Sequence, residues 1–345
     1  MSRSTARRLA RRAAPAALAA VAAALVFAVS VRLFPYHSLN HDEAVYLQQA
    51  AMLLDGRVNL YPPVRGAFRP WFFVADGARL YPKYAPVPAA AFALGEAAAG
   101  TYRLSLAAVA GGNVLACYAV TREAFDRRTG LLAAAFLVAS PLFVLDSTVF
   151  LPYAPTALLN WTFALAYLRA ARTRSRRWAA LAGAAVGLAF FSRPFTAVLF
   201  AAPFVAHAGY ELAVTGGDRE AVARQGVVAA LGLAGVAVAL GYNALVTGSP
   251  WLFPYEAFAP RDGIGFGHRE ILGYAREYTP ALAVRANAEA VSLLFGRWVA
   301  GGALGASLAA LGAALALRVE SVRWRRHSPA AARAVLAGLF LSVVA

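Results

Sequence analysis

The sequence predicts an all-α, polytopic bundle of transmembrane helices, and three observations lead to that prediction. Of the 345 residues, 60% are hydrophobic and only 14% are charged, and the mean hydropathy is +0.57. Apolar runs recur along the whole chain, and a run of about 20 apolar residues is long enough to cross a bilayer. The basic residues gather in short clusters between these runs, which is the pattern of cytoplasmic loops in membrane proteins.

Charge and cysteine content exclude several other classes of protein. The formal net charge of +16 would suggest a nucleic-acid partner in a soluble protein. Here the basic residues lie between apolar runs, so we expect no nucleic acid as a partner. The single cysteine, Cys117, lies inside an apolar run, which excludes a disulfide framework and a cysteine metal site.

The arginine clusters predict the orientation of the chain. Arginines crowd the N-terminus before the first apolar run, so we expect this terminus in the cytoplasm. The expected spans cover residues 16–34, 101–120, 131–149, 152–170, 178–192, 194–212, 226–247 and 290–317, with a last one starting near 333. The same orientation puts the clusters at 122–128, 169–177 and 318–333 on the cytoplasmic side.

A single multi-pass domain over residues 1–345 in the cell membrane is therefore expected, with two long extracytoplasmic segments at 35–100 and 248–289. The last apolar run has only about 13 residues before Ala345, which is too short to cross a bilayer. From this we expect a C-terminal region that is short, or a natural chain that continues.

The first outer segment begins with a predicted helix. Asn40 followed by Glu43 resembles a capping box. The residues that follow give the helix one apolar side, and Gly56 is suited to end it. We expect this helix to lie on the outer membrane surface. Asp42 and Glu43 in its first turn would complement the helix dipole, or one of them would serve as a general base. The sequence leaves both interpretations open.

The same segment ends at a notable lysine. Asp76-Gly77 between aromatic stretches predicts a hairpin turn, and Lys83, the only lysine of the chain, follows it. A compact ammonium group on a flexible stem suits a phosphate oxygen. The alternative is a side chain that snorkels to lipid headgroups.

Further candidates are spread over the outer side. Arg193, where two short apolar runs meet, would bind a phosphate or snorkel to headgroups. Asp146, near the outer end of a helix hairpin, would be a second functional acid or an interfacial polar residue. The residues expected to line a cavity are His41, Tyr84, Asn243, His268 and Arg269.

Metal binding has one candidate cluster. His37 and His41 are four residues apart and adjoin the acidic pair Asp42 and Glu43, but Pro35 lies close by and need not leave His37 on a helix. We expect no metal site and no required cofactor. A divalent cation held by the acidic pair beside phosphates is left open as the alternative.

Three motifs together resemble the GT-C superfamily of membrane glycosyltransferases. They are the Asp42-Glu43 pair just outside the first span, the segment Lys83-Tyr84-Ala85-Pro86, and the segment from Tyr242 to Pro250 that contains Asn243 and Thr247-Gly248-Ser249. The chain is most similar to the lipid-carrier-dependent transferases related to protein O-mannosyltransferases and the lipid A aminoarabinose transferases.

The resemblance implies a fold, an activity and roles for residues. It implies a GT-C-like helix bundle that moves a hexose or pentose, with inversion, from a polyprenyl phosphate to an acceptor hydroxyl outside the membrane. By position, Asp42 resembles the catalytic acidic residue and Glu43 its neighbour. Lys83 resembles the residue that contacts the carrier phosphate, and Arg193 is a looser match to an arginine near it. The segment 151–155 lacks the acid expected there, which leaves Asp146 nearby.

The residues suit this chemistry without the resemblance. A phosphate leaving group needs cations more than a strong acid, the acceptor hydroxyl needs a positioned base, and the carrier tail needs a groove between helices. The sequence does not specify the sugar or whether the acceptor is a glycan, a lipid or a protein. One alternative is a transporter, although neither paired repeats nor midplane ionisable residues are evident; another is a catalytically silent relative.

Overall fold

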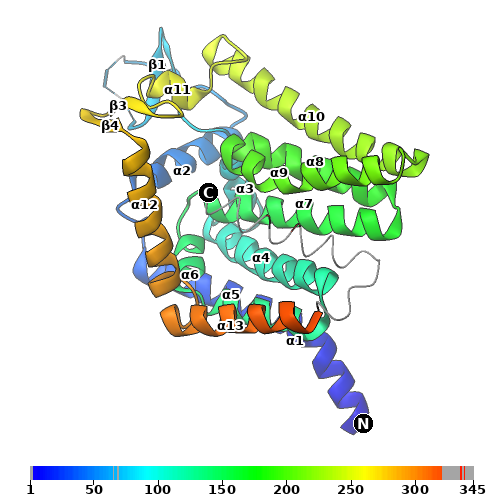
Figure 1. The fold of residues 1–345 in the computed structure, drawn as a ribbon. Helices are drawn as coiled ribbons and strands as arrows, with labels where there is room; N and C mark the ends of the chain where they lie inside the picture. The colour runs from blue at the N-terminus through cyan, green and yellow to red at the C-terminus, as the bar shows by residue number, and fades with distance from the viewer. Residues whose placement is uncertain (1–2, 65, 68–69, 321–334, 336–337, 339–345) are drawn as a thin grey trace.

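The computed structural model describes residues 3–64, 66–67, 70–320, 335 and 338. It consists of helices with two small β-hairpins at one end (Figure 1). Among the described residues, four helices are long and apolar enough to cross a membrane, or six spans if each of two bent pairs counts as one. The predicted all-α polytopic bundle is therefore confirmed.

The bounds of the elements are as follows. The helices are α1 (Arg3–Leu33), α2 (His41–Leu54), α3 (Val87–Ala99), α4 (Arg103–Ala124), α5 (Arg127–Val138), α6 (Pro141–Ser147), α7 (Tyr153–Thr173), α8 (Arg176–Ser192), α9 (Pro194–Val214), α10 (Arg219–Thr247), α11 (Pro254–Phe258), α12 (Pro280–Leu293), the π-helical turn η1 (Leu294–Trp298) and α13 (Gly302–Glu320). The strands are β1 (Phe73–Asp76), β2 (Arg79–Pro82), β3 (Gly267–Ile271) and β4 (Tyr274–Tyr278).

The bundle has two chemically different ends. We call one the hairpin end, because the antiparallel pairs β1–β2 and β3–β4 lie there with α11 (Figure 1). The opposite end carries the arginine clusters at 122–128 and 169–177, and we call it the basic end. Helices α7, α8, α9 and α10 run side by side between the two ends (Figure 1). The basic clusters and the long polar segments thus lie at opposite ends of the bundle.

Two of the predicted straight spans are broken helices. The expected span 131–149 is split into α5 and α6, which meet at 65°, because Pro141 follows Ser140 and cannot continue the backbone hydrogen bonds of α5. The span expected at 290–317 is bent by 97° between η1 and α13. Gly301 and Gly302 there have φ of +74° and +53°, which glycine adopts at little cost. The last predicted span, near 333, lies almost wholly outside the described residues.

Small residues let the central helices approach closely. A Cβ atom on Gly183 of α8 would lie 2.7 Å from the carbonyl oxygen of Val228 on α10, and one on Gly187 would lie 3.0 Å from the Cα of Gly235. Helix pairs in membranes use such small-residue contacts because they lack a hydrophobic driving force between helices. This accounts for the glycine and alanine content of the spans.

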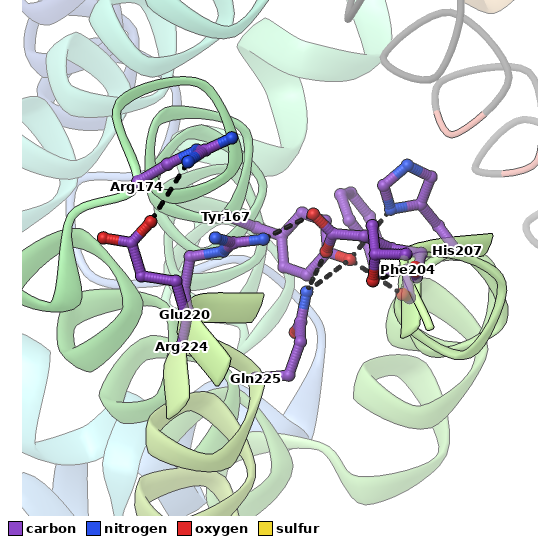
Figure 2. Close-up of polar contacts among 9 residues, drawn as sticks. Tyr167, Arg174, Phe204, His207, Glu220, Arg224 and Gln225 are labelled. Atoms are coloured by element: carbon purple, nitrogen blue, oxygen red, sulfur yellow. Dashed lines mark hydrogen bonds and ion pairs between the residues drawn. The ribbon is translucent and has the colours of Figure 1, made fainter. Parts of the chain in front are cut away.

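A polar cluster ties three helices together at the basic end (Figure 2). The Tyr167 hydroxyl of α7 lies 2.9 Å from His207 Nδ1 of α9. Gln225 of α10 donates to one Glu211 carboxylate oxygen at 2.8 Å, and the buried Arg224 pairs with the other. Both oxygens of this carboxylate are therefore occupied within the bundle.

Candidate functional site

Asp42 lies in the first turn of α2, next to the end of β2. The side chain of Asn40 caps the helix by accepting a hydrogen bond from the Asp42 amide at 3.0 Å, as the sequence predicted. Asp42 Oδ1 lies 3.1 Å from Lys83 Nζ, and 29% of the Asp42 side chain is exposed. The two residues singled out at opposite ends of the first outer segment thus form an ion pair.

Glu43 has a different environment from its neighbour. Its residue is only 1% exposed; one carboxylate oxygen accepts from the Phe150 amide at 2.8 Å and the other from the Ser38 amide at 2.8 Å. The predicted capping box is therefore wrong in its second half, because this carboxylate does not turn back to the Asn40 amide. Instead, Glu43 ties the start of α2 to the turn between α6 and α7.

The ammonium group of Lys83 lies in a box of aromatic rings. Nζ is 3.7 Å from the ring centroid of Phe72 and 4.7 Å from that of Tyr84. From α11 and its start come Phe258 at 4.9 Å and Tyr255 at 5.7 Å. The ring faces attract the cation, although burial lowers the pKa of Lys83 below its usual value and the Asp42 carboxylate opposes that shift. A buried cation is thus shared by both outer segments.

Phe72 is held in a costly backbone conformation beside this lysine. Its φ of +61° is in the left-handed region, which a bulky side chain rarely adopts. Its carbonyl oxygen accepts the Lys83 amide at 3.2 Å, and its ring is the nearest of the four to Nζ. Such strain concentrates at functional sites, and here it holds the ring over the ammonium group.

A cavity of about 520 Å³ opens at the hairpin end between the two outer segments and the ends of the helices. Its wall includes three cationic side chains, Lys83, Arg193 and Arg269. It also includes two carboxylates, Glu256 and Asp262. The remaining wall is largely aromatic or apolar, with Tyr46, Tyr84, Tyr153, Phe191, Phe195, Phe253 and Tyr255 among its members.

Arg193 enters the cavity from the junction between α8 and α9. Pro194 follows it, which disfavours helical backbone at the preceding residue, and Arg193 is extended with φ −150° and ψ 92°. Its guanidinium lies 4.5 Å from the ring centroid of Tyr153. In the described part of the chain, no carboxylate lies within ion-pair distance of Arg193. A half-buried arginine with no described carboxylate at ion-pair distance is suited to an anionic ligand.

Of the other residues expected near the site, some lie on the cavity wall and some do not. Tyr84, Asn243 and Arg269 line the cavity. His41 stacks on Trp71 with ring centroids 4.7 Å apart, and His268 pairs with Glu277 across the second hairpin at 2.9 Å. Neither histidine is on the wall, and neither is Asp146, Asp42 or Glu43.

Sequence reasoning missed Tyr255, Phe258 and Asp262 of the second outer segment. Tyr255 donates a hydrogen bond to Asp262 at 2.6 Å, and burial raises its pKa well above the usual value, so the hydroxyl keeps its proton. The sequence offered one signal, an aromatic stretch from Trp251 to Phe258. It gave no means of telling that this stretch folds over Lys83, about 170 residues away.

Within the ranges that the structure describes, no group of three or more histidine, cysteine, aspartate or glutamate side chains is placed to hold a metal ion. The candidate histidine His37 instead contacts the Ser38 carbonyl oxygen at 2.6 Å.

Comparison with known protein families gives a match to the central part of the chain. The model of the family described as dolichyl-phosphate-mannose-protein mannosyltransferase matches residues 89–242, from α3 to α10. The matched region contains Asp146 and Arg193 but not Asp42 or Lys83. No curated protein matches the chain. The match supports a glycosyltransferase of the mannosyltransferase-like kind. The match over residues 89–242 therefore supports the resemblance to the GT-C superfamily that the three sequence motifs indicated.

Proposed function

We propose that the protein is an inverting glycosyltransferase that moves a sugar from a polyprenyl phosphate to an acceptor hydroxyl. The observation that supports this most is the pair of cations at the cavity. Lys83 and Arg193 come from separate parts of the chain and line the same wall, and the Asp42 carboxylate adjoins Lys83 at 3.1 Å. An anionic leaving group and a hydroxyl nucleophile need this combination of cations and a base.

The reaction follows from these three side chains. Lys83 and Arg193 bind the phosphate oxygens of the donor. The acceptor oxygen attacks the anomeric carbon from the face opposite the phosphate, and its proton passes to Asp42. The bond between the anomeric carbon and the phosphate oxygen breaks, and the polyprenyl phosphate leaves with the electron pair. Both cations then stabilise the negative charge that grows on the leaving group.

Glu43 has a positioning role in this proposal. Its carboxylate is engaged by backbone amides on both oxygens, so it is a poor candidate for taking a proton from the acceptor. By joining α2 to residue 150, it fixes the helix turn that carries Asp42. Asp146, on α6, stays a proposal for a second acid.

The orientation in the membrane is also part of the proposal. Arginine clusters mark the cytoplasmic side of membrane proteins, and here they lie at the basic end. With the basic end in the cytoplasm, the cavity faces the extracytoplasmic side of the cell membrane and α1 begins inside. The carrier lipid reaches the cavity from the outer leaflet.

Binding of the donor tests the proposal directly. A panel of polyprenyl-phosphate sugars is titrated against purified wild-type protein, Lys83→Ala and Arg193→Ala, with Arg57→Ala as a matched control on the exposed surface of the first outer segment. Removing a charge-assisted contact to phosphate costs about 1.5–3 kcal/mol, so we expect each cavity variant to bind at least about tenfold more weakly. The control should bind like the wild type.

Two results would contradict the proposal. Absence of binding to every lipid phosphate, with the protein shown to be folded, would favour a transporter. Binding without transfer to any acceptor would favour a catalytically silent relative of the GT-C enzymes.

A further inference from the structure

The cavity wall carries two carboxylates beside its three cations, Lys83, Arg193 and Arg269. Glu256 belongs to α11, and Asp262 lies between α11 and β3. Carboxylates repel a phosphate, so a carboxylate on this wall suits a part of the ligand that carries no negative charge.

Of the two acids, Asp262 has free acceptor capacity. Its Oδ2 accepts the Tyr255 hydroxyl at 2.6 Å. Its Oδ1 lies 3.8 Å from the Arg269 guanidinium, which is too long for a hydrogen bond. A carboxylate has about four acceptor sites, so several remain open on this partly exposed group. Glu256, in contrast, accepts the Phe253 amide at 3.2 Å and closes the first turn of α11.

The position of this wall relative to the phosphate cation fits the donor. In a sugar phosphate the sugar is bonded directly to the phosphate, so its binding site must adjoin the cation. The Tyr255 ring centroid is 5.7 Å from Lys83 Nζ, and the Tyr255 hydroxyl holds Asp262. The ring offers an apolar face and the carboxylate offers acceptors, which is the mixed surface that a sugar with its C–H and O–H groups requires.

We propose that Asp262 and Tyr255 bind the sugar of the lipid-linked donor and determine which sugar is accepted. Sugar hydroxyls, or an amino group where the sugar has one, donate hydrogen bonds to Asp262, and the C–H face of the ring packs on Tyr255. This inference rests on the proposed function, because it takes the phosphate to lie on Lys83 and Arg193. In this proposal, the second outer segment recognises the donor sugar.

The test separates the sugar from the carrier. Bare polyprenyl phosphate and a panel of polyprenyl-phosphate sugars, mannose included, are titrated against wild type, Asp262→Asn and Tyr255→Phe. Glu277→Gln, an exposed acid on the same segment, is the matched control. We expect Asp262→Asn to weaken binding of the preferred sugar phosphate about tenfold, because a hydrogen bond to a charged acceptor is lost. Its affinity for the bare carrier should stay within about twofold of wild type.

The variant Tyr255→Phe, for which we expect a smaller loss of binding, tests the role of the Tyr255 hydroxyl. Tyr255→Phe keeps the ring but removes the hydroxyl that holds Asp262, so we expect a partial loss of sugar-dependent binding, about threefold. In the same assay, Lys83→Ala should weaken the binding of both probes by the same factor. Glu277→Gln should behave as wild type with both.

Each contrary outcome has its own meaning. If Asp262→Asn weakens binding of the bare carrier as much as binding of the sugar phosphate, or changes neither, the sugar site is refuted and the proposed function stands. If no sugar binds more tightly than the bare carrier, the sugar site is likewise refuted. If wild type binds neither probe, the lipid-phosphate donor is wrong and the sugar site falls with it.

Discussion

Charged side chains gather at both ends of the bundle, but they are paired within the bundle at one end and face a cavity at the other. At the basic end, Glu211 receives Arg224 on one oxygen and Gln225 on the other. At the hairpin end, Arg193 lines an open cavity, and no described carboxylate is within ion-pair distance of it. The first arrangement holds helices together, whereas the second keeps charge available for a ligand.

Lys83 and Asp42 stand between these two cases. They pair with each other at 3.1 Å, but the Asp42 side chain keeps partial exposure, and the pair lies beside the cavity. A fully buried ion pair contributes little net stability, because desolvation offsets the attraction. A pair at the edge of a cavity has a function if a ligand phosphate replaces the Asp42 carboxylate as the partner of the Lys83 ammonium group. The comparison therefore separates charges that serve packing from charges that serve a ligand.

The largest effect is expected from the base itself. Asp42→Asn keeps the shape of the side chain but cannot take a proton, so we expect transfer to fall about 10²–10⁴-fold. Donor binding should change little by comparison, since the phosphate contacts are made by Lys83 and Arg193. Initial rates of sugar transfer and donor titrations on the same preparation measure the two effects.

Asp76→Asn is the matched control for that experiment. Asp76 lies on the same outer segment, is 53% exposed and pairs only with Arg79 among the described residues, so this variant should transfer at the wild-type rate. Full activity of Asp42→Asn would remove Asp42 from the mechanism and leave Asp146 as the acid to examine.

At the basic end, the largest effect should be on stability. Arg224→Met leaves the Glu211 carboxylate without its cation at a site where Arg224 is 5% exposed, and we expect a loss of about 3 kcal/mol. The double variant Arg224→Met/Glu211→Met should recover much of the loss, because no unpaired charge remains. Thermal unfolding of the purified protein in detergent compares the three proteins.

Donor binding by the folded Arg224→Met variant provides the cross-check. If the basic end only holds helices together, binding measured well below the unfolding temperature stays at the wild-type value. Weaker binding without lower stability would mean that the two ends are coupled, and the comparison drawn above would break down.

The smallest effect concerns pH. Burial lowers the pKa of Lys83, so its ammonium group loses its proton at a lower pH than that of an ordinary lysine. Donor affinity should therefore begin to decline below the ordinary lysine pKa of about 10.4 as the pH rises. Lys83→Arg should keep its affinity over this range because a guanidinium stays protonated. Donor titrations along a pH series measure both curves.

Lys83→Arg also provides the outcome that would exclude this explanation. If its affinity declines along the same curve as that of the wild type, a group other than Lys83 titrates. A constant offset at neutral pH, from the poorer fit of a guanidinium in the aromatic box, would not affect the conclusion.

Several features were predictable from the sequence because they depend on local patterns. Apolar runs and arginine clusters gave the helix bundle and its two unlike ends, and Asn40 and Gly56 gave the bounds of α2 to within a residue or two. Asp76-Gly77 predicted the first hairpin, which the structure confirms. The GT-C resemblance rested on short motifs, and the match over residues 89–242 bears it out.

Other features depend on contacts between distant residues, and the sequence could not supply them. Glu43 follows Asp42 directly, yet only the fold directs it to the Phe150 amide and its neighbour to Lys83. The sequence predicts straight spans where α5 and η1 end in bends, because mean hydropathy over a window does not detect a break in the helix. The hairpin β3–β4 of the second outer segment is not among the predictions from the sequence.

The sequence by itself determined the kind of molecule: a membrane helix bundle with a polar outer segment and a single lysine at its end. Only the tertiary structure decided which side chains share a cavity, because Lys83, Arg193 and Asp262 belong to three segments brought together by packing. Local propensity and hydropathy act over one or two helical turns. The convergence of these charges depends on closing loops of about 70 to about 180 residues, which no local pattern encodes.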